Sequence, residues 1–179
     1  MRKLSILLIM TLLITGCTSS TKVNSPGFVA PCDQIKLVES AKKSVLLPCL
    51  DGVGEINFYQ LKGPLVINVW GSWCEGCKQE MPYFVELYQS PLFKSGQIQM
   101  LGVNVEEKSK EDAIEYIQKS GMSWPNLEDT SGLSKSIFGP GVPVTWFINE
   151  NGKTVAIKIG AYTSKKQLLA QIRKEFLIK

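Results

Sequence analysis

Two cysteines three positions apart are the residues of this chain best suited to chemistry. Cys74 and Cys77 stand in the stretch "VWGSWCEGCKQEMP", residues 69–82. A two-residue spacer closes almost no chain, so a disulfide between them would contribute little to stability. If a helix begins at Cys74, its free N–H groups and positive end favour a thiolate there. We therefore predict a redox pair, in which Cys74 attacks a substrate disulfide and Cys77 then resolves the mixed disulfide.

A glutamate three residues after Cys77 is the candidate proton carrier. On a helix, Glu80 and Cys77 lie on the same side. A carboxyl group facing inward beside a buried thiol would have a raised pKa and could shuttle the proton of the resolving thiol. The alternative is a solvated glutamate on the surface. Glu75, between the cysteines, is predicted to tune the pair, because negative charge beside Cys74 opposes the thiolate and favours a more reducing couple.

The other cysteines are Cys17, Cys32 and Cys49. Cys17 follows the export signal described below and is expected to carry a lipid, which leaves Cys32 and Cys49 as a second pair, with two free thiols as the alternative. A disulfide there would contribute about 3 kcal/mol of stability through its loop. A four-cysteine zinc site is disfavoured because only one of the spacings is tight. The chain has no histidine, which excludes an imidazole base and disfavours most transition-metal sites. We predict no metal and no cofactor.

Residues 1–16 have the features of an export signal. Arg2 and Lys3 precede an apolar stretch, residues 4–13, which is shorter than the roughly 20 residues that a membrane-spanning helix needs. The ending "LITGC" resembles a bacterial lipobox, which implies cleavage before Cys17 and a lipid on its thiol. An ordinary signal peptide or an uncleaved anchor is the alternative. Both place the domain outside the cytoplasm, where disulfides persist.

The rest of the chain divides into a tether and one domain. Residues 17–28 are polar, rich in Ser and Thr, and contain a Pro-Gly turn, which predicts a flexible, lipid-anchored tether. Residues 29–179 are long enough for one core. The formal net charge of +4 falls to +2 when Arg2 and Lys3 are removed, because 18 basic residues then face 16 acidic ones. This charge is too small to suggest a nucleic-acid partner, and we expect a monomer.

The elements that must position the redox pair alternate between two patterns. Apolar runs predict strands at residues 64–70, 98–105, 142–148 and 154–159. Helical spacing predicts helices that begin near Cys74, Ser109 and Ser164, and a short one at residues 133–138. Pro82 is expected to bend the first helix, and an Asn-Gly turn predicts that the last two strands form a hairpin. This alternation predicts an α/β layered domain with a mixed sheet.

Several motifs together resemble a known family. "WCxxC" at a strand-to-helix turn and "GVP" before a later strand resemble the thioredoxin superfamily. The stretches "VINVWGSWCEGCKQEMPYF" and "VPVTWFINENGK" are most similar to its TlpA/ResA-like branch, whose members are membrane-tethered, extracytoplasmic thiol-disulfide oxidoreductases. The resemblance covers roughly residues 45–179. It implies a thioredoxin-like fold, with a central mixed β-sheet flanked by helices and an inserted β-α unit around residues 106–130.

The resemblance also implies how substrate is bound. The Val142–Pro143 bond is expected to be cis, so that these two residues hold backbone atoms against the dithiol to receive an extended substrate. Trp73 would cover the dithiol and contact the substrate; without the resemblance it is only a partly exposed aromatic at a turn. The other tryptophans are expected in the core.

Further residues match the branch one by one. Glu80 matches a glutamate that the branch carries three residues after its second cysteine, whereas Asn68 stands where thioredoxin itself has a buried aspartate. A cysteine after "LP" in this chain supports a structural disulfide between Cys32 and Cys49.

The function that the resemblance implies is enzymatic. It is a lipid-anchored thiol-disulfide oxidoreductase that reduces disulfides of exported proteins, as in cytochrome c maturation, with electrons from a membrane thiol-redox partner. Glu75 and Gly76 replace the Gly-Pro of thioredoxin and tune the potential, so the opposite direction, oxidation of thiols in secreted proteins, stays open. A peroxiredoxin would need an activating arginine, and only Arg173 lies outside the leader. A copper-binding module would need histidine or methionine ligands, and histidine is absent.

Overall fold

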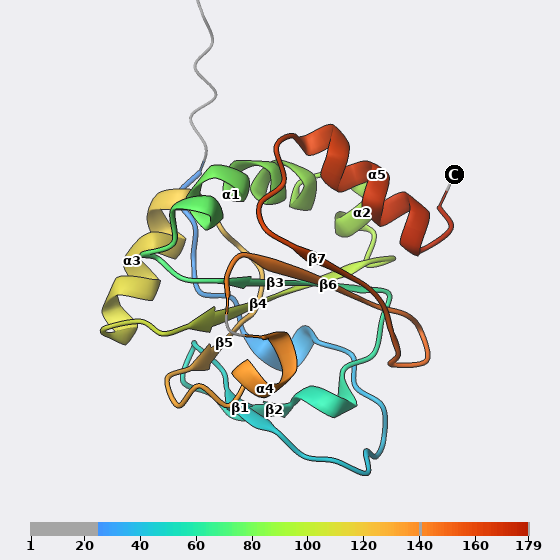
Figure 1. The fold of residues 1–179 in the computed structure, drawn as a ribbon, viewed down its shortest axis with the longest axis horizontal. Coiled ribbons are helices and arrows are strands. Elements are labelled where there is room, and N and C mark those ends of the chain that lie inside the picture. The colour runs from blue at the N-terminus through green and yellow to red at the C-terminus, as the bar shows by residue number, and fades with distance from the viewer. Residues whose placement is uncertain (1–24, 140, 179) are drawn as a thin grey trace, which may run out of the picture.

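A five-stranded mixed sheet forms the centre of the molecule, in the order β5-β4-β3-β6-β7 (Figure 1). The computed structural model describes residues 25–139 and 141–178, so the predicted signal peptide and Cys17 lie outside the described residues. β3 is parallel to β4 and antiparallel to β6. The strands of this sheet are β3 (Leu65–Trp70), β4 (Gln99–Val105), β5 (Asn126–Asp129), β6 (Val144–Ile148) and β7 (Thr154–Ile159).

The central strand β3 is buried along its whole length. Its sequence, LVINVW, is apolar at almost every position because both faces of the sheet are covered. Val66 and Trp70 point toward the helices on one face, whereas Leu65, Ile67 and Val69 point into a second cluster on the other. β3 therefore holds its carboxyl end, where the cysteine motif begins, rigidly in the middle of the fold.

Helices cover the first face of the sheet and a smaller layer covers the second (Figure 1). α1, α2 and α5 lie above the sheet in that view, with α3 at its side, whereas α4 and the β1–β2 hairpin lie below. Among the described residues, no helix combines the length and the apolar character needed to cross a membrane. The remaining bounds are β1 (Leu46–Pro48), β2 (Glu55–Asn57), α1 (Glu75–Tyr88), α2 (Pro91–Lys94), α3 (Lys110–Ser120), α4 (Lys135–Phe138) and α5 (Lys165–Glu175), with 3-10 turns at Cys32–Gln34 and Phe58–Gln60.

Helix starts are set by side-chain caps. The hydroxyl groups of Ser109 and Ser164 accept the backbone N–H groups of Asp112 and Gln167, as their spacing predicts. Helix α1 continues through Pro82 to Tyr88, so the proline does not end it.

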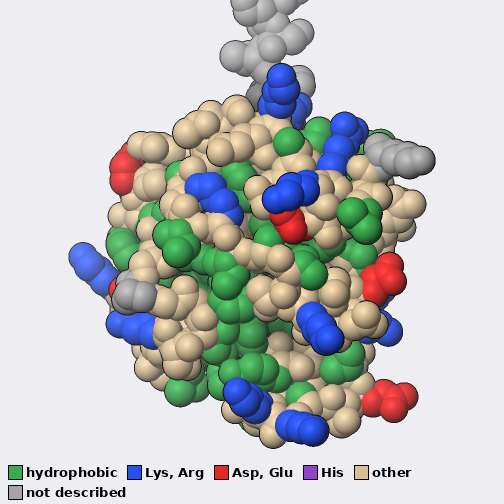
Figure 2. Space-filling model, turned by 45° about the vertical axis from the view of Figure 1, so that its right-hand side comes forward, with side chains coloured by type: hydrophobic (Ala, Val, Ile, Leu, Met, Phe, Trp, Pro, Cys, Tyr) green, Lys and Arg blue, Asp and Glu red, His purple; other side chains and the backbone are tan. Residues whose placement is uncertain are grey.

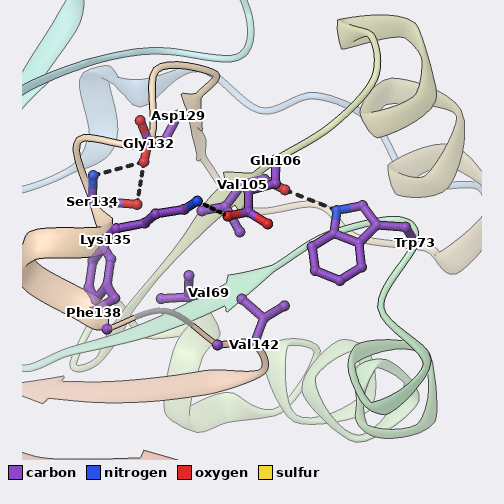
Figure 3. A pocket seen from close by; sticks show the side chains of 12 residues that line it. Val69, Trp73, Val105, Glu106, Asp129, Gly132, Ser134, Lys135, Phe138 and Val142 are labelled. Carbon is purple, nitrogen blue, oxygen red and sulfur yellow. Dashed lines mark hydrogen bonds and ion pairs between the residues drawn. The ribbon is translucent and has the colours of Figure 1, made fainter.

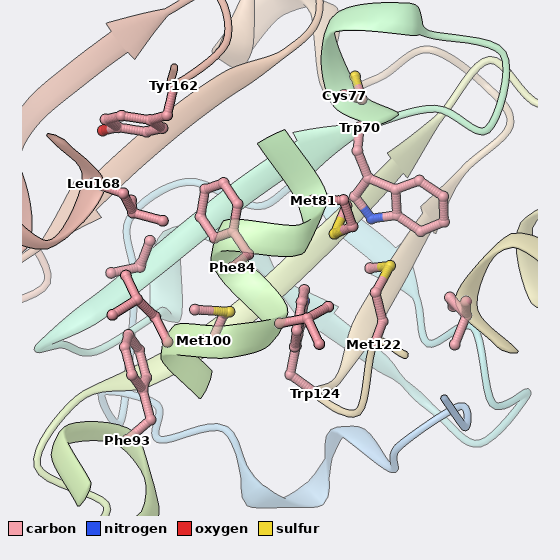
Figure 4. Close-up of a cluster of buried hydrophobic side chains, with 14 of the residues drawn as sticks. Trp70, Cys77, Met81, Phe84, Phe93, Met100, Met122, Trp124, Tyr162 and Leu168 are labelled. Atoms are coloured by element: carbon pink, nitrogen blue, oxygen red, sulfur yellow. The ribbon is translucent and has the colours of Figure 1, made fainter. Parts of the chain in front are cut away.

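The larger core lies between the sheet and the helices (Figure 4). Met81 and Phe84 enter it from α1, and Trp70 and Trp124 are completely buried in it. Trp146, also expected in the core, is only half-buried. Cys77 lies in the same core, so the second cysteine of the motif is anchored in the best-packed part of the domain.

The architecture predicted from the sequence is confirmed: the domain is α/β, with a central mixed sheet flanked by helices. The expected unit around residues 106–130 consists of α3 and β5, which extends the sheet at one edge. The boundary between the tether and the domain lies earlier in the chain than predicted. Gly27 and Phe28, predicted to lie in the tether, donate backbone N–H groups to Gln118 and Met122, so these two residues belong to the folded domain.

A disulfide joins Cys32 to Cys49, with their Cα atoms 6.1 Å apart. Both residues are buried. Cys49 forms a backbone bridge with Leu127 of β5, and the Cys32 sulfur lies 3.8 Å from the backbone oxygen of Asn126. The disulfide thus fastens the N-terminal segment to the edge of the sheet, far in the chain from Cys74.

Removal of this disulfide should lower stability without affecting the redox pair. Because the cysteines are 17 positions apart, Cys32→Ala/Cys49→Ala should lose about 3 kcal/mol of unfolding free energy, or about 6–12 °C in Tm. Urea unfolding of the oxidised proteins measures this. The matched control, Cys74→Ser/Cys77→Ser, should lose less, because only three positions separate its cysteines. Equal losses would contradict a structural role specific to Cys32 and Cys49.

Candidate active site

The cysteine motif occupies the junction of β3 and α1. β3 ends at Trp70, and Cys74 is the N-cap of α1. The Cys74 sulfur accepts the backbone N–H of Cys77 at 3.1 Å, and the two residues form a disulfide with Cα atoms 5.3 Å apart. Cys74 is 5% exposed, whereas Cys77 is 0% exposed. Cys74 is therefore the sulfur that a substrate can approach, and the helix end stabilises its thiolate.

The turn before Cys74 is held by the end of β4. The Trp73 indole N–H donates to the backbone oxygen of Val105 at 3.3 Å, and the side chain remains 49% exposed. The Ser72 backbone N–H and hydroxyl donate to Glu107 at 2.5 and 2.7 Å, and Asn104 donates to the same carboxylate. Sequence reasoning missed Glu107, because nothing in its spacing links it to a residue 35 positions earlier.

The predicted substrate-binding proline lies directly against the motif. The Val142–Pro143 bond is cis, as the resemblance implies. A Cβ atom placed on Gly76 would lie 3.1 Å from Pro143 and 3.7 Å from Ala161. We expected Gly76 to tune the redox pair. Its lack of a side chain also allows the dithiol turn to pack close to Pro143.

Glu80, three residues after Cys77 on α1, is completely buried, which rules out the solvated alternative. The Asn68 side-chain amide donates to one carboxylate oxygen at 3.0 Å, and the Tyr162 backbone N–H donates to the other at 2.9 Å. Burial raises the pKa of Glu80 to about 7, against the opposing effects of the Tyr162 and Asn68 hydrogen bonds and the Lys158 charge. Glu80 can therefore gain or lose a proton near neutral pH.

The charge of Glu80 also affects the tyrosines around it. Burial, with the negative charges of Glu80 and Glu75, raises the pKa of Tyr116 to about 12. Burial and Glu80 likewise raise the pKa of Tyr162. Both phenols therefore stay protonated at neutral pH, which leaves Glu80 as the group of this cluster that titrates there.

A small pocket is lined by Trp73, which directly precedes Cys74, and by Val142, which precedes Pro143 (Figure 3). Val69, Val105 and Phe138 give it an apolar lining. Lys135 extends from α4 across the opening to form an ion pair with Glu106 (Figure 3). The pocket thus combines apolar side chains with the Lys135–Glu106 ion pair and with the buried polar residues Asp129 and Ser134.

An apolar surface also leads toward Pro143 along the edge strand β7. Val155, Ile157 and Ile159 are exposed at alternate positions. Ile159 pairs with Val144, which follows Pro143. Figure 2 shows hydrophobic side chains gathered in a continuous band on one face, with lysines spaced around it.

The described residues offer little for a metal ion. Cys32, Cys49 and Asp51 are the only described histidine, cysteine or acidic side chains grouped closely enough to hold one. Both sulfurs of this group are in a disulfide, which leaves one carboxylate as a ligand.

Comparison with known proteins agrees with this geometry. The chain matches the AhpC/TSA family over residues 38–157. It is 30% identical over 169 residues to the thiol-disulfide oxidoreductase ResA of Bacillus thuringiensis (strain Al Hakam), covering 93% of this chain and 92% of that protein. It is 35% identical over 118 residues to ResA of Geobacillus thermodenitrificans (strain NG80-2), covering 64% of this chain and 66% of that protein. This second match therefore spans slightly less than two thirds of the relative.

Solved structures show the same fold and confirm the thioredoxin-like fold that the resemblance implies. StoA from Bacillus subtilis superposes with a TM-score of 0.58 at 24% identity, covering 72% of this chain and 95% of that one. A Mycobacterium tuberculosis protein, dsbF, superposes with a TM-score of 0.63 at 20% identity, covering 82% and 99%.

Proposed function

Because the chain belongs to the AhpC/TSA family and to the ResA group of thiol-disulfide oxidoreductases, we propose that Cys74 and Cys77 reduce disulfide bonds of exported proteins. The observation that supports this most directly is the arrangement at the start of α1. Cys74 caps the helix and is slightly exposed, Cys77 is completely buried, and the buried carboxyl group of Glu80, which titrates near neutral pH, follows three residues later on the same helix.

The reaction proceeds in two exchanges. The Cys74 thiolate attacks one sulfur of the substrate disulfide, forms a mixed disulfide, and releases the other substrate sulfur as a thiolate. Glu80 then takes the proton of Cys77, whose thiolate attacks the Cys74 sulfur and releases the second substrate thiolate. Two electrons pass from the dithiol to the substrate, and the protons of the two cysteines pass to the substrate thiols by way of Glu80 and solvent.

The surroundings of Cys74 suit an extended polypeptide substrate. The Pro143 ring lies against Gly76 of the dithiol turn, and Trp73, directly before Cys74, is half exposed. The apolar pocket between Trp73 and Val142 would receive a substrate side chain next to the disulfide. The exposed apolar residues of β7 extend this surface, which favours unfolded proteins, whose apolar segments are accessible.

The cellular setting of the proposal comes from the leader and the relatives. A lipid on Cys17 would hold residues 29–179 outside the cytoplasm, near a membrane partner that returns the Cys74–Cys77 pair to its dithiol form. Apocytochrome c is the substrate class that the resemblance suggests. Normal levels of c-type cytochromes in a deletion strain would contradict this specific role. General reduction of disulfides in exported proteins would then remain as the proposed function.

The opposite direction, oxidation of secreted thiols, is the second candidate. The hydrogen bond from Cys77 N–H to the Cys74 sulfur and the helix end both stabilise a thiolate, which favours the reduced form and an oxidising couple. Glu75 in the first turn of α1 acts the other way, because its charge opposes the thiolate.

The reduction potential of the Cys74–Cys77 pair separates these candidates. We expect a potential below about −200 mV, nearer to the values of cytosolic reductants than to that of DsbA, about −120 mV. Equilibration with dithiothreitol in a Cys32→Ala/Cys49→Ala background measures it. Glu75→Gln should make the potential less negative by about 10–30 mV. A potential near that of DsbA, with the pair mostly oxidised in cells, would favour the oxidase.

A further inference from the structure

Lys158 of β7 directs its ammonium group at backbone oxygens of the loop that follows it. Its Nζ donates to the carbonyl groups of Ile159 at 3.1 Å, Gly160, and Ala161 at 2.9 Å. It also lies 5.0 Å from the centre of the Tyr162 ring. An ammonium group has three N–H donors, and here three consecutive carbonyl groups accept from it.

The loop that Lys158 binds contacts two parts of the active site. The Gly160 backbone N–H donates to the Pro143 carbonyl at 2.9 Å. Two residues later, the Tyr162 backbone N–H donates to Glu80 at 2.9 Å. The conformation of residues 159–162 therefore fixes both the substrate-binding proline and the buried carboxyl group of Glu80.

The Lys158 ammonium group stabilises this conformation. Gly160 has a positive φ of 82°, and the turn there brings three carbonyl oxygens toward one point. Without a donor between them these oxygens would repel one another. The carbonyl oxygens of Gly160 and Ala161, whose hydrogen bonds to Lys158 are partly buried, would then lose this partner. Lys158 supplies the donors from the preceding strand, with its aliphatic chain beside the Tyr162 ring.

The positive charge of Lys158 also acts on Glu80. The groups around Glu80 come from each element packed on it: Asn68 from β3, Cys77 from α1, Tyr116 from α3, Tyr162 from the loop, and Lys158 from β7. The Lys158 charge lowers the pKa of Glu80 against the effect of burial. Within this set, Lys158 is the group that carries a positive charge.

We propose that Lys158 is a positioning residue for the exchange reaction: it holds the loop that binds Pro143 and Glu80, and its charge stabilises the Glu80 carboxylate. The inference rests on the proposed use of Glu80 as the proton carrier of Cys77. It identifies the residue that links the proton carrier to the substrate-binding segment.

The test compares Lys158→Met with a matched control, Lys153→Met. Both remove one positive charge from the same β6–β7 hairpin, but Lys153 is exposed in the turn. The first readout is a 13C NMR titration of the Glu80 carboxyl carbon in the oxidised protein, which does not depend on activity. The second is hydrogen exchange of the Tyr162 amide, and the third is the pH dependence of disulfide reduction.

In Lys158→Met, the Glu80 titration should move to higher pH by about 0.5–1 unit, and the Tyr162 amide should exchange at least about tenfold faster as its hydrogen bond loosens. The pH–rate profile should move with the titration, whereas Lys153→Met should match the wild type. Lys158→Arg keeps the charge and the donors, so its Glu80 titration should lie close to that of the wild type. This variant guards against a general folding defect.

An unchanged Glu80 titration in Lys158→Met would overturn the proposal while the proposed function stood. The function itself is tested separately by Glu80→Gln. If that variant kept the wild-type pH–rate profile, the proton role of Glu80 would fail and the proposal for Lys158 would fail with it.

Discussion

Substitution of Cys77 by serine should stop turnover and leave substrate proteins covalently attached to Cys74. Cys74 remains at the start of α1, where it can still attack a disulfide, because the helix end and the turn that stabilise its thiolate do not depend on the Cys77 sulfur. The resolving thiol is absent, so the mixed disulfide persists. Insulin reduction should fall to the uncatalysed rate, and non-reducing electrophoresis of cell extracts should show adducts that dithiothreitol releases.

The controls for this experiment use the other cysteines. Cys74→Ser should show neither turnover nor adducts, since it lacks the accessible sulfur. Cys32→Ala/Cys49→Ala should keep its activity at temperatures well below its lowered Tm, because the disulfide it lacks joins Cys32 to Cys49, whose backbone pairs with β5 and not with the cysteine motif. Adducts that survive in Cys74→Ser, or multiple turnovers by Cys77→Ser, would contradict the assigned roles. Mass spectrometry of the adducts would identify the substrates.

Substitution of Glu80 by glutamine should slow disulfide reduction about a hundredfold at pH 7, within the range of general acid–base catalysis. In the wild type, the rate should rise as pH passes about 7, because the pKa of Glu80 lies there and the carboxylate accepts the Cys77 proton. The rate of the Glu80→Gln variant should lack this rise and should vary with pH only through ionisation of the thiols. Stopped-flow measurement of the resolving step from pH 5 to 9 checks this.

Glutamine fits the Glu80 site without loss of hydrogen bonds. Its oxygen can accept from the Tyr162 N–H, and its amide can donate to Asn68 if that side chain turns over. The Asn68 oxygen is buried and has no partner in the present arrangement, so it is available to accept. Glu80→Leu is the contrasting variant, because it would leave both donors unpaired and should lower stability by about 1–3 kcal/mol per donor.

Glu80→Gln should also change how the free energy of unfolding depends on pH. Burial raises the pKa of Glu80 from an ordinary 4.5 to about 7, so the folded protein binds this proton more tightly than the unfolded chain does. The resulting stabilisation is complete below pH 4.5 and is lost as pH rises through 7. It amounts to on the order of 3 kcal/mol. Urea unfolding of the oxidised wild type should show this decline, and Glu80→Gln should lack it.

The pair formed by Asn68 and Glu80 shows how far sequence reasoning reached. The resemblance implied that Glu80 could take over the role of an aspartate that thioredoxin has at the position of Asn68. The structure adds that the two residues are bonded to each other. Asn68 therefore holds the proton carrier in place. Helical spacing alone could not distinguish this from a solvated glutamate, because it gives the direction of a side chain and not what covers it.

The sequence by itself predicted the Cys74–Cys77 pair, the α/β architecture and the larger elements, but not the β1–β2 hairpin or α2. The predicted features depend on local spacing and on the periodicity of apolar residues, which are written along the chain. Only the tertiary structure decided which sulfur is accessible and how tightly Glu80 binds its proton. Its partner Tyr162 is 82 positions away, and Glu107 and Lys158 likewise act across the fold on residues distant in the chain. A pKa depends on burial and on neighbouring charges, and distant segments supply both.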